Sequence, residues 1–397
     1  MATVIELGAV EGFILDDPVA GVLDNTVYTL GGTVFKDITS RVISATTSRG
    51  KNRDLDRFSS GTLNITASNE DRAFDPNYAS SPYAGAIVPR REVRVTVDGV
   101  RVISTTIDDW NYGYSPDGSS RAEIVATDEF TLLARQVLTA GTATPQLSGA
   151  RVSAVLDMLS VAWPADRRSI DTGESTLGAD VFEGNALQYL QKISDSEQGL
   201  LFIAKNGDLV FRDRLDATPT TASLTDFADD GTGIPFTLTA VNYGSELLYN
   251  QAVVTSGELS AQADNDRSQV AYGVTSVELD TLVSTSAQLQ NLADFLVQKY
   301  GDPEYRFETI SVNLDTVGAT YKATCLGLEI GDVVSITFTP NGIGAPIQQY
   351  GQIIRISHEL EPLRHDMFIS VSSLDWTFLV LDDAVFGKLD SNNALAF

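Results

Sequence analysis

Residues 40–48 read SRVISATTS and residues 61–68 read GTLNITAS, two runs in which apolar and polar side chains alternate. Alternation with a period of two is typical of a strand that is buried on one face only. Further alternating runs follow at 92–97 (EVRVTV), 100–106 (VRVISTT) and 121–126 (RAEIVA). Because the connections between them are rich in Gly, Asn, Asp and Pro, these short strands predict a small barrel or sandwich.

One connection is specific enough to predict its own geometry. Asp98 and Gly99 separate two of the alternating runs. A two-residue connection of this kind predicts a hairpin with a type I′ turn, since both of its central residues need positive φ.

The middle of the chain changes to helical spacing. Residues 150–160 (ARVSAVLDMLS) place their apolar side chains on one face, and Pro164 stops the run. Asn185 is the predicted cap of a second helix, which Gly199 ends. A β-hairpin is expected directly afterwards, over residues 200–214.

The last part of the chain combines strands with one helix. Residues 216–232 are rich in Thr and Asp and predict a surface loop. Residues 286–300 (SAQLQNLADFLVQKY) predict a helix that ends before Gly301. The strand-like runs are 307–314, 331–339, 350–359 and 366–373.

A short repeat occurs near both ends of the chain. Residues 15–24 and 381–390 both fit L-D-D-x-x-x-G-x-L-D. An acidic pair, a Gly that can adopt positive φ and anchoring Leu side chains suit a segment that docks onto a groove. A duplicated edge segment that packs on its own domain is the alternative. The predicted interaction residues are Leu15, Asp16, Asp17, Gly21, Leu23, Asp24, Leu381, Asp382, Asp383, Gly387, Leu389 and Asp390.

Charge narrows the possible functions. The 53 acidic and 27 basic residues give a net charge of −26, which argues against a nucleic-acid-binding surface because such surfaces need clustered Lys and Arg. Acidity either keeps the protein soluble or repels DNA that passes along it. The excess is uneven, with ten basic and seven acidic residues in 41–101 against two basic and eleven acidic in 216–300. Opposite local charges could orient neighbouring copies.

Other broad classes of protein fit the sequence poorly. No stretch reaches the roughly 18 apolar residues that a membrane helix needs, and the first residues lack the basic start of a signal peptide. We therefore expect a chain that is neither inserted into a membrane nor processed. Cys325 is the single cysteine and argues against internal disulfides and cysteine-cluster metal sites.

The sequence offers little catalytic chemistry. His358 and His365 flank Pro362 and do not fit the H-E-x-x-H zinc motif, so we expect two partly exposed histidines around a turn. Adjacent carboxylates such as Asp108 and Asp109 could hydrolyse a glycoside only if the fold placed two of them across a cleft. Nucleotide-binding and hydrolase motifs do not occur. We predict no enzymatic activity, no cofactor and no metal.

Two kinds of polar stretch allow a binding interpretation. Residues 69–75 (NEDRAFD) and 264–266 (DND) offer oxygen ligands for calcium, but neither has the final bidentate Glu of a calcium loop, so solvated turns are expected. Asp54 and Asp56 are interleaved with a basic set, which predicts exposed salt bridges or contacts to an acidic neighbour rather than to nucleic acid. The basic set is Arg49, Lys51, Arg53 and Arg57.

One aromatic stretch is a candidate for ligand binding. Trp110, Tyr112 and Tyr114 lie within DDWNYGYSPDG and could contact a receptor or a host-wall glycan. Packing in the core or at its rim is the alternative, since aromatic side chains more often serve burial.

Three blocks of sequence resemble a known family. They are residues 37–83, 185–214 and 328–375. All three resemble minor tail proteins of long-tailed, siphovirus-type bacteriophages, and the first block is the most specific. It is most similar to tail proteins of phages that infect actinobacteria.

The resemblance implies a fold and a domain organisation. The expected fold is a β-rich α+β fold, in which two small β-barrel domains carry an inserted α/β portion of helices and a hairpin. The expected divisions are an N-terminal arm (1–36), a first barrel (37–145), the α/β insert (146–235), a second barrel with a helix at about 286–300 (236–375) and a C-terminal arm (376–397).

The resemblance also implies a function. The expected protein is a structural, baseplate-hub-like subunit at the tail tip, which links the tail tube to distal tip proteins and lines the DNA exit channel. Its implied partners are two further copies in a homotrimer, other tail tip proteins, the distal tail protein and the tape measure protein, with DNA passing unbound. The implied location is the virion, after assembly in the host cytoplasm. A tail tip protein that binds a receptor or host-wall glycan is the alternative.

Overall fold

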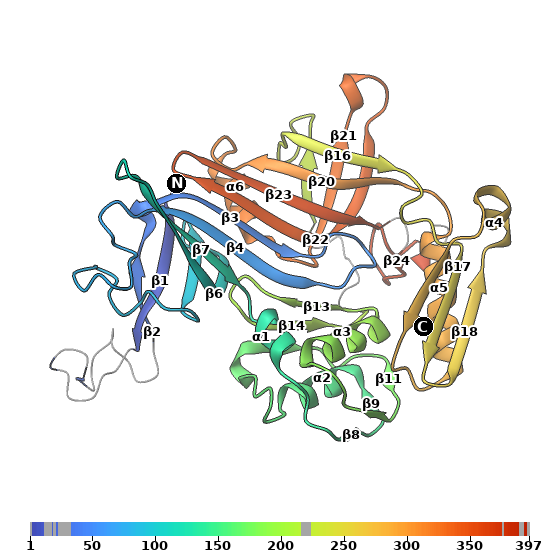
Figure 1. The fold of residues 1–397 in the computed structure, drawn as a ribbon. Helices are drawn as coiled ribbons and strands as arrows, with labels where there is room; N and C mark the ends of the chain where they lie inside the picture. The colour runs from blue at the N-terminus through green and yellow to red at the C-terminus, as the bar shows by residue number, and fades with distance from the viewer. Residues whose placement is uncertain are drawn as a thin grey trace.

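A 13-stranded sheet runs across the whole molecule (Figure 1). The structure is a computed structural model that describes residues 2–11, 18, 21–22, 33–215, 224–374, 377–388 and 393–394. The main path of strands is β16-β20-β23-β22-β3-β4-β7-β6-β5-β1-β2, and β21 joins β22 and carries β15. The bounds are β1 Thr3–Glu11, β2 Thr33–Asp37, β3 Val42–Gly50, β4 Ser59–Ser68, β5 Glu92–Val97, β6 Val100–Tyr114, β7 Ser120–Thr127, β15 Thr225–Ala228, β16 Leu238–Tyr243, β20 Tyr305–Asn313, β21 Val333–Phe338, β22 Ile347–Glu361 and β23 Arg364–Ser373.

Alternating side chains build this sheet as the sequence predicts. β3 and β4 pair antiparallel, with Ala45 opposite Ile65. Leu63, Ile65 and Ala67 of β4 are at most 1% exposed, whereas Asn64 between them faces solvent. Burial of such apolar faces contributes roughly 25 cal/mol per Å² of apolar surface and holds the strands on one core.

The predicted turn at Asp98 and Gly99 joins β5 to β6. Their φ angles are 48° and 84°. Both values are positive, as a type I′ turn requires, so the predicted geometry is confirmed.

Strand β22 joins the two halves of the sheet. Residues 347–352 of β22 pair with β21, and residues 355–360 pair with β3. Strands from the N-terminal and C-terminal parts of the chain therefore share one continuous sheet. The expected β-rich fold is confirmed, but no ladder among the described residues closes either half into a barrel of its own.

A helical part lies against one side of this sheet and has its own core (Figure 1). The Asn185 side chain accepts a hydrogen bond from the Gln188 amide at the start of α3, as predicted. Gln198, with a φ of 57°, ends this helix one residue before the expected Gly199. The elements are α1 Phe130–Arg135, β8 Thr142–Ala143, β9 Gln146–Leu147, α2 Ser148–Leu156, the 3-10 turn Ala165–Arg167, β10 Arg168–Ile170, β11 Thr176–Leu177, β12 Asp180–Val181, α3 Ala186–Glu197, β13 Leu200–Ile203 and β14 Leu209–Arg212.

A second small part, the α5 part, lies beside the main sheet, on the right in Figure 1. It contains a three-stranded sheet in the order β18-β17-β19, and α5 packs on it. The helix matches the predicted range of 286–300, but the separate sheet beside it was not predicted. The elements are β17 Gln251–Ser256, β18 Leu259–Asp264, α4 Asp266–Tyr272, β19 Ser276–Asp280 and α5 Ser286–Tyr300. In the described part of the chain no helix is long and apolar enough to cross a membrane.

The N-terminal end of the chain differs from the expected arm at 1–36. Residues 3–11 and 33–37 form β1 and β2 inside the main sheet, where β1 pairs with β5 and with β2. The first copy of the repeat therefore falls in the connection between two sheet strands. The remaining elements are the 3-10 turns Thr39–Arg41 and Pro340–Gly342, α6 Ala319–Gly327, β24 Thr377–Phe378 and β25 Asn393–Ala394.

Candidate functional site: the ionic junction at residues 49–58

The connection between β3 and β4 contacts the other parts of the molecule. We call residues 49–58 the junction segment. Leu55 packs against the core of the α5 part, and Phe58 belongs to the core of the helical part. A Cβ on Gly50, which has a φ of 122°, would lie 2.2 Å from the carbonyl oxygen of Ile354, so only Gly fits this close approach to β22.

Arg49 ties the main sheet to the region that follows α6. Its guanidinium lies 2.7 Å from Oε1 of Glu329, and its side chain is only 5% exposed. Oε2 of Glu329 accepts a hydrogen bond from the Lys205 amide at 3.1 Å. Burial opposes the charge on Glu329, but Arg49 and nearby backbone amides outweigh it, so the pKa of Glu329 is lowered. Lys205 in turn donates to the carbonyl oxygens of residues 326–328 at the end of α6.

The other two arginines of the junction segment reach different elements. Arg53 lies 2.5 Å from Oε1 of Glu246, which precedes the α5 part. Arg57 lies 2.7 Å from Oδ2 of Asp195 on α3. The predicted salt bridges thus exist, but their acidic partners come from distant parts of the same chain. Arg49 is also buried rather than exposed.

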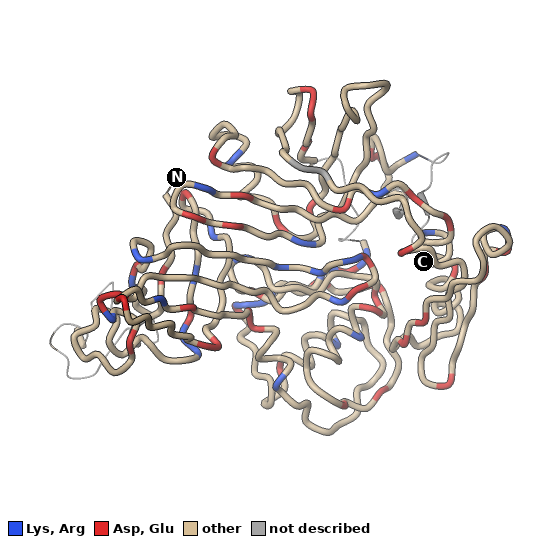
Figure 2. The backbone as a smooth tube through the Cα atoms, turned by 45° about the horizontal axis from the view of Figure 1, so that its top comes forward, with Lys and Arg blue, Asp and Glu red and all other residues tan. Residues whose placement is uncertain are grey.

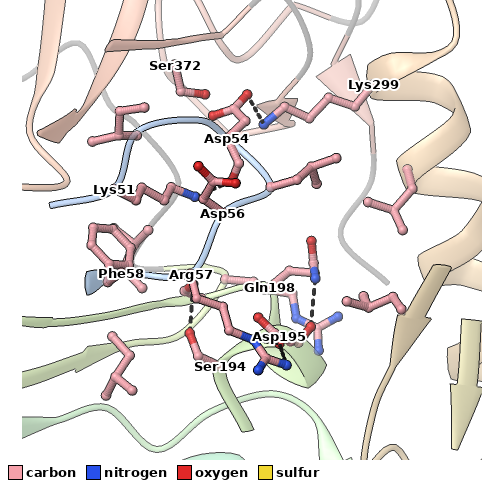
Figure 3. Close-up of a pocket in the computed structure, with 18 of the residues that line it drawn as sticks. Lys51, Asp54, Asp56, Arg57, Phe58, Ser194, Asp195, Gln198, Lys299 and Ser372 are labelled. Atoms are coloured by element: carbon pink, nitrogen blue, oxygen red, sulfur yellow. Dashed lines mark hydrogen bonds and ion pairs between the residues drawn. The ribbon is translucent and has the colours of Figure 1, made fainter. Parts of the chain in front are cut away.

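Asp54 forms the centre of the contact with α5 (Figure 3). One carboxylate oxygen, Oδ2, lies 3.6 Å from Nζ of Lys299 and accepts a hydrogen bond from the Tyr300 hydroxyl at 3.3 Å. Nζ of Lys51 donates to the Asp54 carbonyl oxygen. Burial opposes the charge on Asp54, but Lys299 and Lys51 outweigh it and lower its pKa. Burial is the largest influence on Lys51 and lowers the pKa of that amine.

Two cavities flank the junction segment. The first has a volume of about 220 Å³ and lies between α3 and α5 (Figure 3). The second has a volume of about 330 Å³ and lies over the β16, β20, β22 and β23 ends. Asp54, Ile354 and Ser372 line both cavities, so the junction segment separates them. The charged groups at this site form ion pairs and hydrogen bonds that hold separate elements together.

The partners of the junction arginines were missed by the sequence analysis. Arg57 and Asp195 are 138 positions apart in the chain, and Arg49 and Glu329 are 280 positions apart. No local spacing links residues so far apart. The one available signal was the excess of basic residues in 41–101 beside an acidic excess elsewhere.

Most of that local basic excess is neutralised within the chain. Ion pairs to carboxylates involve Arg41, Arg49, Arg53, Arg57, Arg72, Arg90 and Arg94. Figure 2 shows Lys and Arg close to Asp and Glu along the central strands, whereas the end with α4 and α5 carries mostly Asp and Glu. Most of these basic residues are therefore not available to attract an acidic surface of a neighbouring copy, which weakens the hypothesis that local charge orients the copies.

The two histidines differ from the expected exposed pair. His358 is 5% exposed and His365 is 0% exposed, and they lie on the paired strands β22 and β23. Nδ1 of His358 lies 2.9 Å from Nε2 of His365, a distance for a shared hydrogen bond. Burial lowers the pKa of His365 to about 4. The hairpin holds both rings inside the sheet, which is why they are buried.

The calcium candidates are polar turns whose oxygens already accept hydrogen bonds. The Asp264 carboxylate accepts from the side-chain amides of Gln251, Gln262 and Gln269. In residues 69–75, Oδ1 of Asn69 accepts from the Phe74 amide at 2.8 Å. Among the described residues no group of three or more His, Cys, Asp and Glu could hold a metal ion.

The aromatic stretch on β6 packs mainly against the protein. Trp110 and Tyr112 are partly buried against the main core, and Nε1 of Trp110 donates to the Val88 carbonyl oxygen at 3.3 Å. Tyr114 is 56% exposed. Packing at the core rim therefore accounts for two of the three candidate rings.

The structure describes part of the repeat. Gly21, Leu381, Asp382, Asp383 and Gly387 lie within the described residues. The Asp383 side chain accepts from the backbone amides of Val385 and Phe386, both at 2.9 Å. The predicted anchor Leu381 is 83% exposed, whereas Phe386 is 2% exposed beside Val333 and Leu374. The predicted residues outside the described part are Leu15, Asp16, Asp17, Leu23, Asp24, Leu389 and Asp390.

Comparison with known proteins identifies relatives in fold. No protein-family model and no curated protein sequence matches this chain. The 43 kDa tail protein of prophage MuSo2 from Shewanella oneidensis matches with a TM-score of 0.60 and 14% identity, over 94% of this chain and 97% of that chain. The tail protein from Neisseria meningitidis MC58 matches with a TM-score of 0.60 and 11% identity, over 94% and 96% of the two chains. Over nearly its whole length, the chain therefore has the fold of these tail proteins.

Proposed function

We propose that this chain is a structural subunit of a phage tail. The observation that supports this role most is the match in fold to two tail proteins, each over 94% of this chain. The role agrees with the resemblance of residues 37–83, 185–214 and 328–375 to minor tail proteins.

The location that we propose is a hub at the tail tip of a siphovirus-type particle. There the chain forms a homotrimer, joins the tail tube to distal tip proteins and lines the DNA exit channel. The host that we propose is an actinobacterium, because residues 37–83 resemble that group most. The two barrel domains and the repeat segments of the sequence analysis belong to the same proposal, the segments as contacts to neighbouring subunits.

The charge distribution supports a channel through which DNA slides. A net charge of −26 repels phosphate, and seven arginines of the first sheet half are paired with carboxylates of the same chain. Such paired cations offer little to a passing phosphate backbone.

The polar groups support a role without catalysis. At the junction segment, Asp54, Asp195 and Glu329 are each held by a cation of another element. Catalytic acids need to face a substrate rather than a structural partner. We therefore propose that the tail subunit carries no enzymatic activity of its own.

The test is the place of the chain in the assembled particle. Mass measurement of the purified full chain gives its oligomeric state, and a cryo-EM map of the tail locates it. We expect three copies around the tail axis at the tip. A chain that is missing from the tail would overturn the structural role, and a peripheral position would overturn the hub.

A further inference from the structure

The larger cavity beside the junction segment is a pocket lined by three arginines. It has a volume of about 330 Å³, and its wall includes Arg53, Arg306 and Arg355. Apolar side chains that include Leu247 and Phe307 form another part of the wall. Three carboxylates, of Asp54, Glu246 and Glu308, belong to the same wall, so the free ligand-binding capacity of the pocket depends on which charged groups already have partners.

Arg355 is held in place by neutral groups. Its Nε donates to Oγ of Ser48 at 2.9 Å, and its Nη1 lies 2.5 Å from Oδ1 of Asn52. No carboxylate of the residues that the structure describes lies within ion-pair distance of this guanidinium. A guanidinium presents five N–H donors, so Arg355 keeps donors for a further acceptor.

A second arginine of the pocket also has an unused donor. Nη2 of Arg306 is buried and has no hydrogen-bond partner among the described residues, although Oε2 of Glu304 lies 3.2 Å away. The acids of the pocket wall have partners of their own: Asp54 pairs with Lys299, Glu246 pairs with Arg53, and Oε1 of Glu308 accepts a hydrogen bond from the Asn242 side-chain amide at 2.9 Å. Carboxylates bind guanidinium groups through short, paired hydrogen bonds, so a carboxylate is the ligand that this pocket fits.

The chain contains a segment with matching chemistry. The first 35 residues hold no Lys or Arg, and they include Glu6, Glu11, Asp16, Asp17 and Asp24. The repeat places Leu15 directly before the adjacent Asp16 and Asp17. A leucine followed by two carboxylates complements a pocket with an apolar wall and free guanidinium donors.

The strand order favours another copy as the source of this segment. Residues 12–32 connect β1 and β2, which form one end of the strand path. The pocket is built by β16, β20, β22 and β23, which form the other end. A contact between opposite ends of the same subunit type is heterologous, and such contacts close into rings when the rotation permits.

We propose that the acidic segment 12–24 of one copy docks into the arginine pocket of a second copy through carboxylate contacts to Arg355 and Arg306. The proposal rests on the proposed function, because it supplies one contact by which the subunits of a tail ring hold each other.

The experiment measures this contact directly with a peptide. A synthetic peptide of residues 12–26 is titrated by calorimetry into the full chain that carries Asp16→Asn and Asp17→Asn, so that the chain's own segment does not compete. We expect saturable binding that weakens at least tenfold when Arg355 is replaced by Gln. A peptide with the same two Asn substitutions should bind at least tenfold more weakly as well.

Two controls separate a lost contact from a lost fold. Arg364→Gln changes an exposed arginine on β23 that pairs with Asp366 outside the pocket, and it should leave peptide affinity unchanged. Thermal unfolding checks that the Arg355→Gln chain is folded. Absent binding, or equal affinity for the Arg355→Gln chain, would overturn the proposal. That result would leave the tail role intact, because the tail role is tested by the position of the chain in the particle.

Discussion

Two ionic networks in this molecule use the same kinds of groups in different surroundings. Inside the helical part, Arg214 and Glu197 have side-chain exposures of 2% and 0% and lie 3.1 Å apart. Across the junction, Arg53 and Glu246 have exposures of 58% and 46% and lie 2.5 Å apart. The exposed pair is the closer one, yet water already solvates both of its members. The distance between the charged atoms therefore does not predict which pair contributes more to the free energy of unfolding. We expect burial to decide this ranking.

The number of partners separates the two networks further. Besides Arg214, Glu197 accepts hydrogen bonds from the Ser148 hydroxyl at 2.6 Å and from the Ser175 amide at 2.8 Å. Within the described part of the chain, Glu246 has one ion pair, which is the pair to Arg53. A buried carboxylate with several donors is satisfied, and losing its charge leaves those donors without an acceptor.

The largest expected effect comes from Glu197→Gln. The substitution removes the charge opposite Arg214 inside a core from which water is excluded, and it places an amide donor against donors. We expect a loss of about 3–5 kcal/mol in the free energy of unfolding, measured by urea denaturation. A loss below about 1 kcal/mol would contradict the ranking by burial.

A partly buried pair should fall between the extremes. Glu329→Gln removes the charge that faces Arg49, whose side chain is 5% exposed while that of Glu329 is 22% exposed. We expect a loss of about 1–3 kcal/mol in the same urea experiment. The matched control is Glu359→Gln on β22, an exposed carboxylate for which a change within about 0.5 kcal/mol is expected. Equal effects of the two substitutions would contradict a special role for Glu329.

The sequence predicted local elements well because their signals are local. The helix at 286–300 and the turn at Asp98 depend on residues that are close together in the sequence and contact one another within one element. The capping role of Asn185 was equally readable, since its partner is three positions away. In these places side-chain periodicity and turn chemistry decide the structure without help from distant contacts.

The candidate site could be predicted only in part from the sequence, because its contacts join residues that are far apart in the chain. The basic residues of the junction segment stood out, but their carboxylate partners come from three other regions of the chain. The burial of His365 was missed because it depends on the pairing of β22 with β23 and on what packs over that hairpin. The continuous sheet was missed too, since the pairing of Arg355 with Gly50 joins strands that the sequence suggested to be in separate barrels.

Acid should weaken the fold through the buried histidines. Burial lowers the pKa of His365 to about 4, below the usual 6.5, so the folded chain binds fewer protons than the unfolded chain between these values. Stability contributed by the neutral ring is therefore present above pH 6.5 and is lost as the pH falls towards 4. We expect the free energy of unfolding of the wild type to fall more steeply over this range than that of His365→Asn.

The comparison of slopes is needed because another buried group acts in the opposite direction. Burial raises the pKa of Asp128 to about 7, so its contribution favours the folded state at lower pH. Asp128 is present in both proteins and cancels in the difference between them. Parallel pH curves for the wild type and His365→Asn would rule out the histidine as a source of acid sensitivity.

The smallest expected effect sharpens the opening comparison. Arg53→Gln breaks the 2.5 Å pair with Glu246, but both side chains are about half exposed and remain hydrated when the pair is lost. We expect a change of at most about 0.5 kcal/mol in the free energy of unfolding. Raising the salt concentration should reduce even this difference, since salt screens exposed charges far more than buried ones. A loss as large as that of Glu197→Gln would contradict the ranking by burial. It would mean that the ion pairs of the junction segment stabilise one another, because an isolated exposed pair contributes too little to the free energy of unfolding to explain such a loss.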